Sequence, residues 1–363
     1  MPDTDASTCA PRNQRQSIPK PNRRAFVTFL MFNDSYLPGC LMAAYGLKVQ
    51  GSRSDRVCLV TKDVSGRARD ALRLVYDKVL PVDEIPLPGY LEESASGAPR
   101  TGSARVEGAA LTRFASLRLG PDGDFGCSYE KIVNIDADLF PVRDFDDIWS
   151  LSAPAGIVNE RREHMADIDA DGKLIPRPDA LRTGKWVWHD VYDGICPPGA
   201  PVPREITDRV AVDYENYGVN ASLLLLEPSM STYDTFMRWV DEGEVRDMVR
   251  NRWAWTDQQA ATYFWSGRWT SLDPSYSVFY GYPSIESARG LHYAGIKPWS
   301  WRKKGFARRI ERFPDYTLWA QRFLEMLEEL PALRNIGGLK LLERELRAVP
   351  LPRMKTRPRT RTR

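Results

Sequence analysis

Two acidic residues, Asp136 and Asp138, directly follow a short apolar run and could together bind a metal ion. Ile132, Val133 and Ile135 predict a buried strand that ends where the acids begin. Alternation would place both carboxylates on one side of that strand, and the turn at its end lets them converge on one ion. Carboxylate oxygens suit Mg²⁺ or Mn²⁺ far better than Zn²⁺. Because an ion held this way keeps open positions, the segment predicts a metal–diphosphate site at the carboxyl end of a strand.

The same pattern has a simpler interpretation, in which the two acids lie in a solvated loop after a strand. The chain contains its own comparison, because Ile168–Asp171 repeats the four residues of Ile135–Asp138. The charged residues that precede this second copy predict no strand there, so we expect an exposed loop. The acid pattern is informative at Asp136 and Asp138 because a strand is predicted before it.

Alternating strand and helix patterns precede the acidic segment and must position it. The predicted strands are Ala25–Met31, Val57–Val60 and Val79–Val82, and the predicted helices are Tyr36–Gln50 and Val64–Tyr76. Short connections in a β-α-β-α-β order predict parallel strands in an α/β, Rossmann-like sheet. The first strand is not followed by G-x-G-x-x-G, which argues against a nicotinamide dinucleotide.

The second half of the chain continues with mixed elements. Leu111–Leu119, Asp144–Trp149, Ser231–Glu242 and Thr256–Phe264 have helical patterns, and Tyr217–Leu226 has a strand pattern. Residues 315–349 predict amphipathic helices interrupted at Pro331 and at Gly337-Gly338. We therefore expect a helical segment over residues 302–349, after the last part of the sheet domain.

Composition is that of an ordinary globular protein of 363 residues, with 42% hydrophobic residues and a net charge of +3. This small charge gives no reason to expect a nucleic-acid partner. Five scattered cysteines without a C-x-x-C motif favour a reducing, cytoplasmic location over a disulfide framework. The sequence contains no apolar signal segment and no run long enough for a membrane span.

Three stretches have compositions typical of irregular chain. Residues 1–24 are polar and rich in proline, and Ser94–Gly108 is rich in glycine, serine and alanine, so we expect disorder in the first and a flexible loop in the second. Residues 159–212 form a charged, proline-rich insert without a clear pattern. The basic residues of 350–363 predict a solvated, disordered tail rather than a binding patch.

Five sequence pieces, in this order, resemble glycogenin-like retaining glycosyltransferases of family 8, which include galactinol synthases. They are FVTFLMFNDSY, IDAD after a strand, NA within YGVNASLLLLEPS, TDQQ, and HYAGIKPW. The resemblance spans residues 25–301, which we take as one domain. It implies a GT-A type fold, an α/β single domain with a mixed, mainly parallel central sheet and C-terminal helices.

The resemblance implies a metal and diphosphate site made from residues far apart in the sequence. Asp136, Asp138 and His292 match the family's ligands for Mn²⁺, with Mg²⁺ as the alternative ion, and Ala137 lies between the two acids. Two further matches are implied to contact the diphosphate, Gly295 through its backbone and Lys297 through its charge.

The resemblance also implies a binding site for a UDP-sugar. Nucleotide-binding positions match Asn33, Tyr36 and Arg69, while Arg113 stands where the family usually has a lysine that contacts phosphate or sugar. The implied sugar-binding and catalytic positions are Asn220, Asp257 and Gln258. The chain departs from the family at Ser222 and at Trp255-Thr256, where glycines are usual. Because of these departures, the resemblance does not identify the donor sugar.

The implied activity is transfer of a hexose or pentose from a UDP-sugar to a hydroxyl acceptor, a glycan, a polyol or a protein, with a homodimer as one arrangement. Two alternatives remain at this point. A catalytically silent sugar-nucleotide or glycan-binding protein would not need the intact acids, His292 and Lys297. A nucleotidyltransferase would need a phosphate-binding glycine or basic loop after the first strand, and FNDSYLPG is a poor one.

Overall fold

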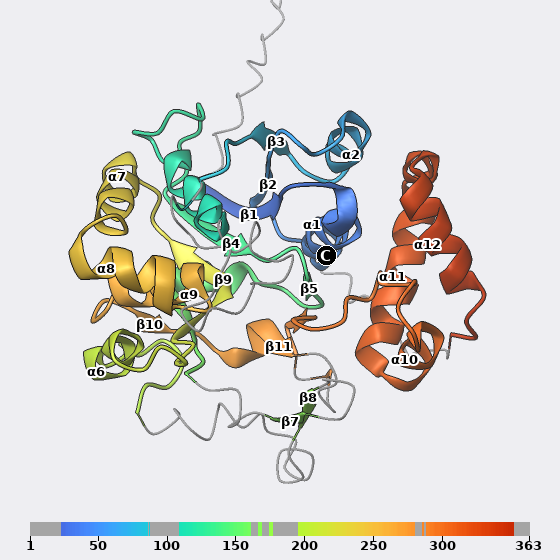
Figure 1. Cartoon of the computed structure of the whole chain (residues 1–363). Helices are drawn as coiled ribbons and strands as arrows, with labels where there is room; N and C mark the ends of the chain where they lie inside the picture. Colours follow the sequence, from blue (N-terminus) through green and yellow to red (C-terminus); the bar gives the residue numbers. More distant parts are fainter. Residues whose placement is uncertain are drawn as a thin grey trace, which may run out of the picture.

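A computed structural model describes residues 23–85, 87, 109–160, 166–168, 174–176, 195–279, 285–286 and 288–351. The predicted loop Ser94–Gly108 and nearly all of the two predicted tails lie outside these residues. The centre of the described molecule is a seven-stranded sheet with the order β10-β6-β9-β4-β1-β2-β3 (Figure 1). The predicted boundaries between domain, insert and tails stay predictions.

One half of the sheet is parallel, as its β-α-β-α-β pattern predicts. Its elements are β1 (Arg24–Leu30), α1 (Leu37–Gln50), β2 (Asp55–Val60), α2 (Gly66–Leu72), β3 (Lys78–Pro81) and β4 (Lys131–Ile135). Local signals set the helix boundaries. Gly51 ends α1 at a φ of 86°, and Ser65 caps the start of α2 by accepting a hydrogen bond from the backbone N–H of Ala68. Helix α2 is shorter than the predicted 64–76.

The other half of the sheet makes it mixed. Its strands are β6 (Ala155–Val158), β9 (Val219–Leu226) and β10 (Thr270–Ser271). Strand β9 lies between β4 and β6 and is antiparallel to both, whereas β10 is parallel to β6. The central position of β9 explains why every residue of this strand is buried, including Asn220 and Ser222.

Both faces of the sheet are covered, and β1 shows how the sequence achieves this. Ala25, Val27 and Phe29 join the core on one face, while Phe26 and Leu30 join the core on the other. Complete burial of a side chain such as Phe26 contributes about 1.5–3 kcal/mol. The first face packs against η2 (Ala110–Leu119), α7 (Met230–Trp239) and α9 (Thr256–Phe264), and the second against α1 and α2.

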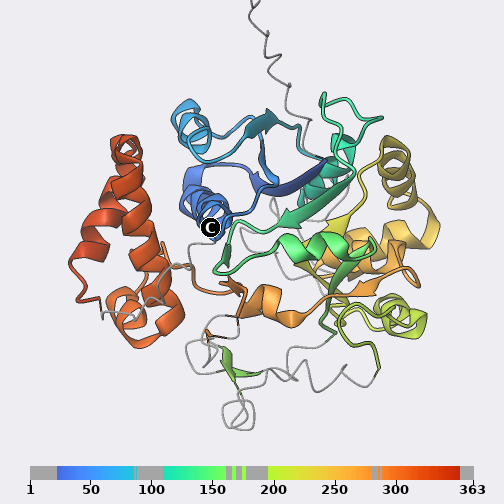
Figure 2. The same ribbon diagram turned by 180° about the vertical axis from the view of Figure 1, so that it is seen from behind.

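The C-terminal helices lie on the α1 side of the molecule in both ribbon views (Figures 1 and 2). They are α10 (Phe306–Arg312), α11 (Pro314–Glu329), η8 (Pro331–Asn335) and α12 (Gly337–Arg347). The helices are interrupted at Pro331 and again just before Gly337-Gly338, where α12 begins, as predicted, and α10 lies within the helical segment predicted over residues 302–349. Helix α11 contacts α1. The predicted α/β fold, with a mixed, mainly parallel sheet and C-terminal helices, is confirmed.

A second, three-stranded sheet has the order β11-β12-β5 and begins where the acidic segment ends. Its strands are β5 (Leu139–Pro141), β11 (Val278–Phe279) and β12 (Gly290–His292). Strand β12 pairs antiparallel with β5, so that His292 lies opposite Leu139. Asp136, Ala137 and Asp138 therefore form the connection between the large sheet and the small one.

The predicted 159–212 insert contains more regular structure than its composition indicated. Strands β7 (Ala166–Ile168) and β8 (Leu174–Pro176) pair antiparallel. The prediction of no strand before Asp169–Asp171 is therefore wrong, since β7 precedes this copy of the acid pattern; residues 169–171 themselves lie outside the described residues. Strand β7 pairs only with β8 among the described strands and is not part of the large sheet.

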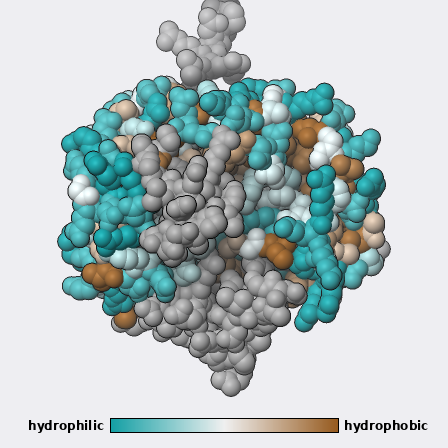
Figure 3. All heavy atoms as spheres, in the orientation of Figure 1, coloured by the Kyte–Doolittle hydropathy of each residue, from teal (hydrophilic) through white to brown (hydrophobic). Residues whose placement is uncertain are grey.

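The remaining helical segments are short, and no described helix is long and apolar enough to cross a membrane. They are η1 (Asp34–Tyr36), η3 (Asp146–Ser150), α6 (Arg204–Thr207), η5 (Asp208–Ala211), α8 (Gly243–Asp247), η6 (Met248–Arg252) and η7 (Pro274–Ser277). The face drawn in Figure 3 is mainly hydrophilic, with small separate hydrophobic patches among the coloured residues.

Candidate active site

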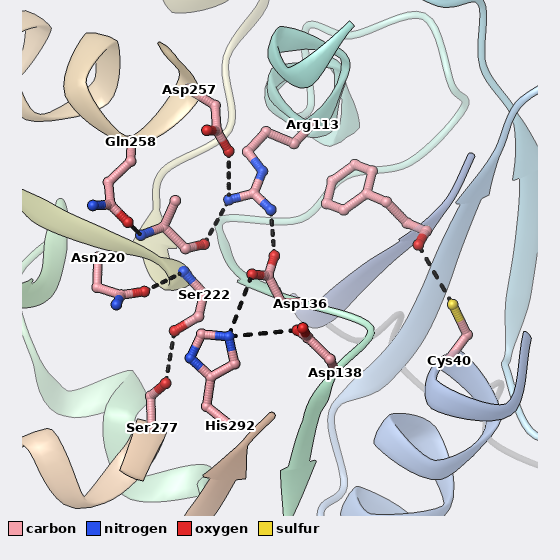
Figure 4. Close-up of polar contacts among 12 residues, drawn as sticks. Cys40, Arg113, Asp136, Asp138, Asn220, Ser222, Asp257, Gln258, Ser277 and His292 are labelled. Atoms are coloured by element: carbon pink, nitrogen blue, oxygen red, sulfur yellow. Dashed lines mark hydrogen bonds and ion pairs between the residues drawn. The ribbon is translucent and has the colours of Figure 1, made fainter. Parts of the chain in front are cut away.

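The two acids and the distant histidine meet at the junction of the two sheets (Figure 4). One ligand atom from each of Asp136, Asp138 and His292 lies within 4.8 Å of the others. His292 Nε2 is 3.5 Å from Asp138 Oδ1 and 4.0 Å from Asp136 Oδ2. The pairing of β12 with β5 creates this proximity, because it places His292 opposite the residue that follows Asp138. Two carboxylate oxygens and one imidazole nitrogen form a donor set that suits Mn²⁺ or Mg²⁺.

Two cations orient the carboxylates so that their other oxygens face the histidine. Arg113 forms a close ion pair with Asp136 Oδ1, and Lys297 forms one with Asp138 Oδ2. Lys297 Nζ also donates to the carbonyl of Tyr293 at 2.6 Å, which fixes its position. The oxygens that remain, Asp136 Oδ2 and Asp138 Oδ1, are those closest to His292 Nε2, so the described residues fit a divalent cation at this point.

The charges of the site balance one another under strong burial. Burial raises the pKa of Asp136, against the opposing effect of Arg113. Burial acts in the same direction on Asp138, but Lys297 and His292 together hold the pKa of Asp138 well below its usual range. Burial lowers the pKa of Lys297, but Asp138, Tyr36 and Asp136 together outweigh this effect and raise the pKa overall. Lys297 and Asp138 therefore stay charged as a pair.

Packing holds the imidazole of His292 in place. Its ring stacks on Phe279, with ring centres 5.2 Å apart and an angle of 28° between the planes. Among the described residues, its buried Nδ1 has no hydrogen-bond partner. Because Nδ1 lacks the carbonyl or carboxylate that usually orients a metal-binding histidine, the stacked ring and the β12 backbone determine where Nε2 points.

A cavity of about 430 Å³ contains most of the predicted site residues. The predicted residues that line it are Asn33, Tyr36, Arg113, Asp136, Ala137, Asp138, Asn220, Asp257, Gln258 and His292. They come from the loop after β1, from η2, from the end of β4, from β9, from the start of α9 and from β12. The fold thus brings together segments from the whole length of the described chain.

Arg113 connects the metal end of the cavity to the end formed by α9. Its Nη1 is 3.1 Å from Asp257 Oδ2 and donates to the carbonyl of Ala221 at 2.7 Å, while Nη2 pairs with Asp136. Burial lowers the pKa of Arg113, but Asp136 and Asp257 outweigh it and raise the pKa overall. A lysine could not span both carboxylates in this way, so the arginine at this position is a structural bridge.

The predicted sugar-binding side chains are tied to the backbone around β9. Gln258 Oε1 accepts a hydrogen bond from the N–H of Ala221 at 3.0 Å, and Gln258 Nε2 donates to the carbonyl of Tyr217 at 2.6 Å. Asn220 Oδ1 accepts from the N–H of Ser222 at 2.8 Å. The hydroxyl of Ser222, where the family usually has glycine, lies 2.7 Å from that of Ser277. These bonds give this end of the cavity a fixed shape.

Three predicted residues lie elsewhere. Arg69 does not line the cavity; it donates to the carbonyls of Thr61 and Lys62, both at 3.1 Å, and so braces the loop after β2. Gly295 and Lys297 line a neighbouring groove of about 700 Å³, which shares Ser35 and Tyr36 with the cavity. The groove continues the cavity toward α12.

Gly39 in α1 packs against the candidate site, and sequence reasoning did not single it out. A Cβ atom at this position would lie 2.2 Å from the carbonyl oxygen of Ala137 and 2.5 Å from Trp299 Cη2. Gly39 therefore lets α1 approach the backbone between the two acids. The signal that could have indicated it was a glycine inside a helix, where glycine lowers stability unless close packing requires it.

Comparison with known proteins shows the family of the chain. The model of "Glycosyl transferase family 8" matches residues 27–302. Uncharacterized protein R707 of Acanthamoeba polyphaga mimivirus is 23% identical over 287 residues, which cover 76% of this chain and 82% of the relative. Galactinol synthase 7 of Arabidopsis thaliana is 22% identical, over 77% of this chain and 75% of its own length. Glycogenin-1 of Oryctolagus cuniculus is 32% identical over 46% of this chain and 41% of its own length. The predicted resemblance is confirmed, and the chain belongs to glycosyl transferase family 8 and is a glycosyltransferase.

Proposed function

We propose that the protein is a metal-dependent retaining glycosyltransferase that moves a hexose or pentose from a UDP-sugar to a hydroxyl acceptor. The observation that carries the proposal is the convergence of Asp136, Asp138 and His292 beside two partly exposed cations, Arg113 and Lys297. The intact acids, His292 and Lys297 speak against a catalytically silent binding protein. The proposed ion is Mn²⁺, with Mg²⁺ as the alternative.

Asp136, Asp138 and His292 would hold the ion in this proposal. When bound, the ion supplies Lewis-acid stabilisation of the negative charge on the diphosphate. Lys297 adds a second positive charge on the same side, and Gly295 lets the backbone approach the phosphates without a Cβ in the way. Asn33 and Tyr36 would hold the nucleoside in the part of the cavity formed by the loop after β1, while Arg69 supports the adjoining loop indirectly.

The sugar would lie at the α9 end of the cavity. Asp257 is ion-paired to Arg113 and can accept hydrogen bonds from sugar hydroxyls through its other oxygen. Gln258 and Asn220 are held by backbone bonds and would present fixed amide groups to the sugar. In the proposed reaction, the acceptor oxygen attacks the anomeric carbon from the face that UDP leaves. The departing phosphate oxygen takes the acceptor's proton, and the anomeric configuration is retained.

A panel of UDP-sugars, assayed for UDP release with and without Mn²⁺, tests the proposal. We expect release from at least one donor only when a divalent cation is present, and no release from an Asp138→Asn variant that keeps its circular dichroism spectrum. Asp234→Asn is the matched control, since Asp234 is an exposed acid on α7. Full activity of Asp138→Asn, or equal activity with excess chelator, would refute metal dependence. Mass spectrometry of the protein and the products then separates self-glycosylation from transfer to a small acceptor.

Cytoplasmic location and homodimer formation remain predictions within this proposal. The four described cysteines are buried free thiols, which supports a reducing compartment. Size-exclusion chromatography with light scattering tests the dimer.

A further inference from the structure

One large aromatic side chain on the cavity wall is unusually exposed. Trp255 is 42% exposed, although tryptophan is normally a highly buried residue type. It lines the cavity together with Tyr217, and their ring centres are 5.6 Å apart with 59° between the planes. Trp255 lies two residues before Asp257, at a position where the family usually has glycine. The chain therefore has an aromatic corner at the sugar end of its cavity.

Two successive glutamines at the start of α9 fix this aromatic corner. Gln259 Oε1 accepts a hydrogen bond from the N–H of Trp255 at 2.9 Å, and Gln259 Nε2 donates to the carbonyl of Asn216, also at 2.9 Å. Gln258 Nε2 donates to the carbonyl of Tyr217. The same turn of helix thus anchors both aromatic residues through their backbones, so that the corner is preorganised.

A buried amide lies next to the corner and lines the same cavity. Asn159 is 2% exposed, and its Oδ1 has no hydrogen-bond partner among the described residues. Its backbone N–H donates to the carbonyl of Gly218, the residue after Tyr217, at 2.7 Å. A buried acceptor without a partner costs about 1–3 kcal/mol. A ligand hydroxyl that donated to Asn159 Oδ1 would remove that cost.

We propose that Trp255, Tyr217 and Asn159 form an acceptor subsite for a pyranose ring, an inference that rests on the proposed glycosyltransferase function. A pyranose has an apolar C–H face that can pack on an aromatic ring and hydroxyls at its edge that can donate to an amide oxygen. The subsite adjoins Asp257 and Gln258, whereas the diphosphate residues Gly295 and Lys297 line the groove beyond Tyr36. The subsite lies beside the proposed donor-sugar position in the same cavity, so an acceptor hydroxyl held there can approach the anomeric carbon on the face that UDP leaves.

Acceptor kinetics test this subsite. Methyl α-glucopyranoside, methyl β-galactopyranoside and methyl β-xylopyranoside are the pyranose probes, with the acyclic polyol sorbitol and a tyrosine-containing peptide as the other acceptor classes. We expect transfer to a pyranoside, with an acceptor KM that rises roughly tenfold in Trp255→Ala, much more than the KM for the UDP-sugar. Trp255→Phe should recover most of the loss. Leu74→Ala is the matched control, since Leu74 is 43% exposed and lines neither the cavity nor the neighbouring groove.

The outcomes separate this inference from the proposed function. If UDP is released but the acceptor KM is the same in the parent protein and in Trp255→Ala, the subsite is overturned and the proposed function stands. Exclusive transfer to sorbitol or to the peptide has the same consequence. Absence of UDP release from every donor refutes the proposed function. In that case, saturation-transfer difference NMR with the three pyranosides, UDP and Mn²⁺ still tests the subsite: binding weakened in Trp255→Ala and in Asn159→Leu supports it, and binding that is absent or equal in all variants overturns it.

Discussion

Replacement of Gly39 by alanine should displace the residues of the metal site, because Gly39 packs against the backbone between the two acids. The new Cβ would lie 2.2 Å from the carbonyl oxygen of Ala137, which is more than 1 Å short of ordinary contact. The obstacle is backbone, at the residue between the two acids, so it cannot rotate away like a side chain. Either α1 or the connection that carries Asp136 and Asp138 must move.

The expected losses of stability and activity follow from the cost of overpacking and from the small displacement that a binding site tolerates. Extra methyl groups in well-packed interiors cost about 1–3 kcal/mol. A displacement of about 1 Å in a reacting or binding group can cost about 100-fold in rate. We therefore expect Gly39→Ala to lower the free energy of unfolding by about 1–3 kcal/mol and to weaken Mn²⁺ binding and UDP release at least tenfold.

A second helical glycine provides the control. Gly66 begins α2, and a Cβ there would meet nothing within 4 Å. Gly66→Ala should leave stability unchanged or raise it by about 0.4–1 kcal/mol. Urea denaturation gives the free energies, and isothermal titration with Mn²⁺ gives the affinity. If Gly39→Ala matches Gly66→Ala in both measurements, the close approach of α1 to Ala137 does not support the metal site.

Two further predictions concern ion pairs. Arg113→Lys removes the bridge to Asp257, because one ammonium group cannot span both carboxylates. We expect kcat/KM for UDP release to fall about 10–100-fold while the circular dichroism spectrum stays unchanged. Activity equal to that of the parent protein would contradict the bridge. The carboxyl of Asp77 is partly buried, which raises its pKa, but two hydrogen bonds from the Arg56 side chain lower the pKa overall. Because the folded pKa lies below the unfolded value of about 3.9, the pair stabilises the protein above that pH and loses this effect as the pH falls through the folded pKa. Urea midpoints of the parent protein and Asp77→Asn should therefore differ at pH 6 and converge toward pH 3; a constant difference would contradict the assigned pKa direction.

Local patterns were sufficient for the parallel half of the fold. Strands β1, β2 and β4 consist mainly of apolar residues, and such runs are buried whichever strands flank them. Helix α1 has a proline in its first turn and a glycine at its end, and α9 has an acid in its first turn. The strand β7 was missed because it has three residues, too short a pattern for periodicity to detect, and among the described strands it pairs only with the adjacent β8.

Long-range pairing decided the rest of the site. No local signal in His292 or its neighbours indicates that β12 lies against β5, and only the resemblance to a family suggested it. The close approach of Gly39 to Ala137 depends in the same way on the packing of α1, and the displacement of Arg69 from the cavity depends on the course of the loop after β2.

The sequence by itself determined the buried strands, the helices between them and the chemical types at the site, because burial and helix spacing depend on neighbours along the chain. The tertiary structure alone decided which oxygens of Asp136 and Asp138 face His292, and that Arg113 reaches Asp257 as well. It also decided that Trp255 stands exposed beside Tyr217. These features depend on distances between atoms contributed by separate strands and helices, which only the packing of the two sheets fixes.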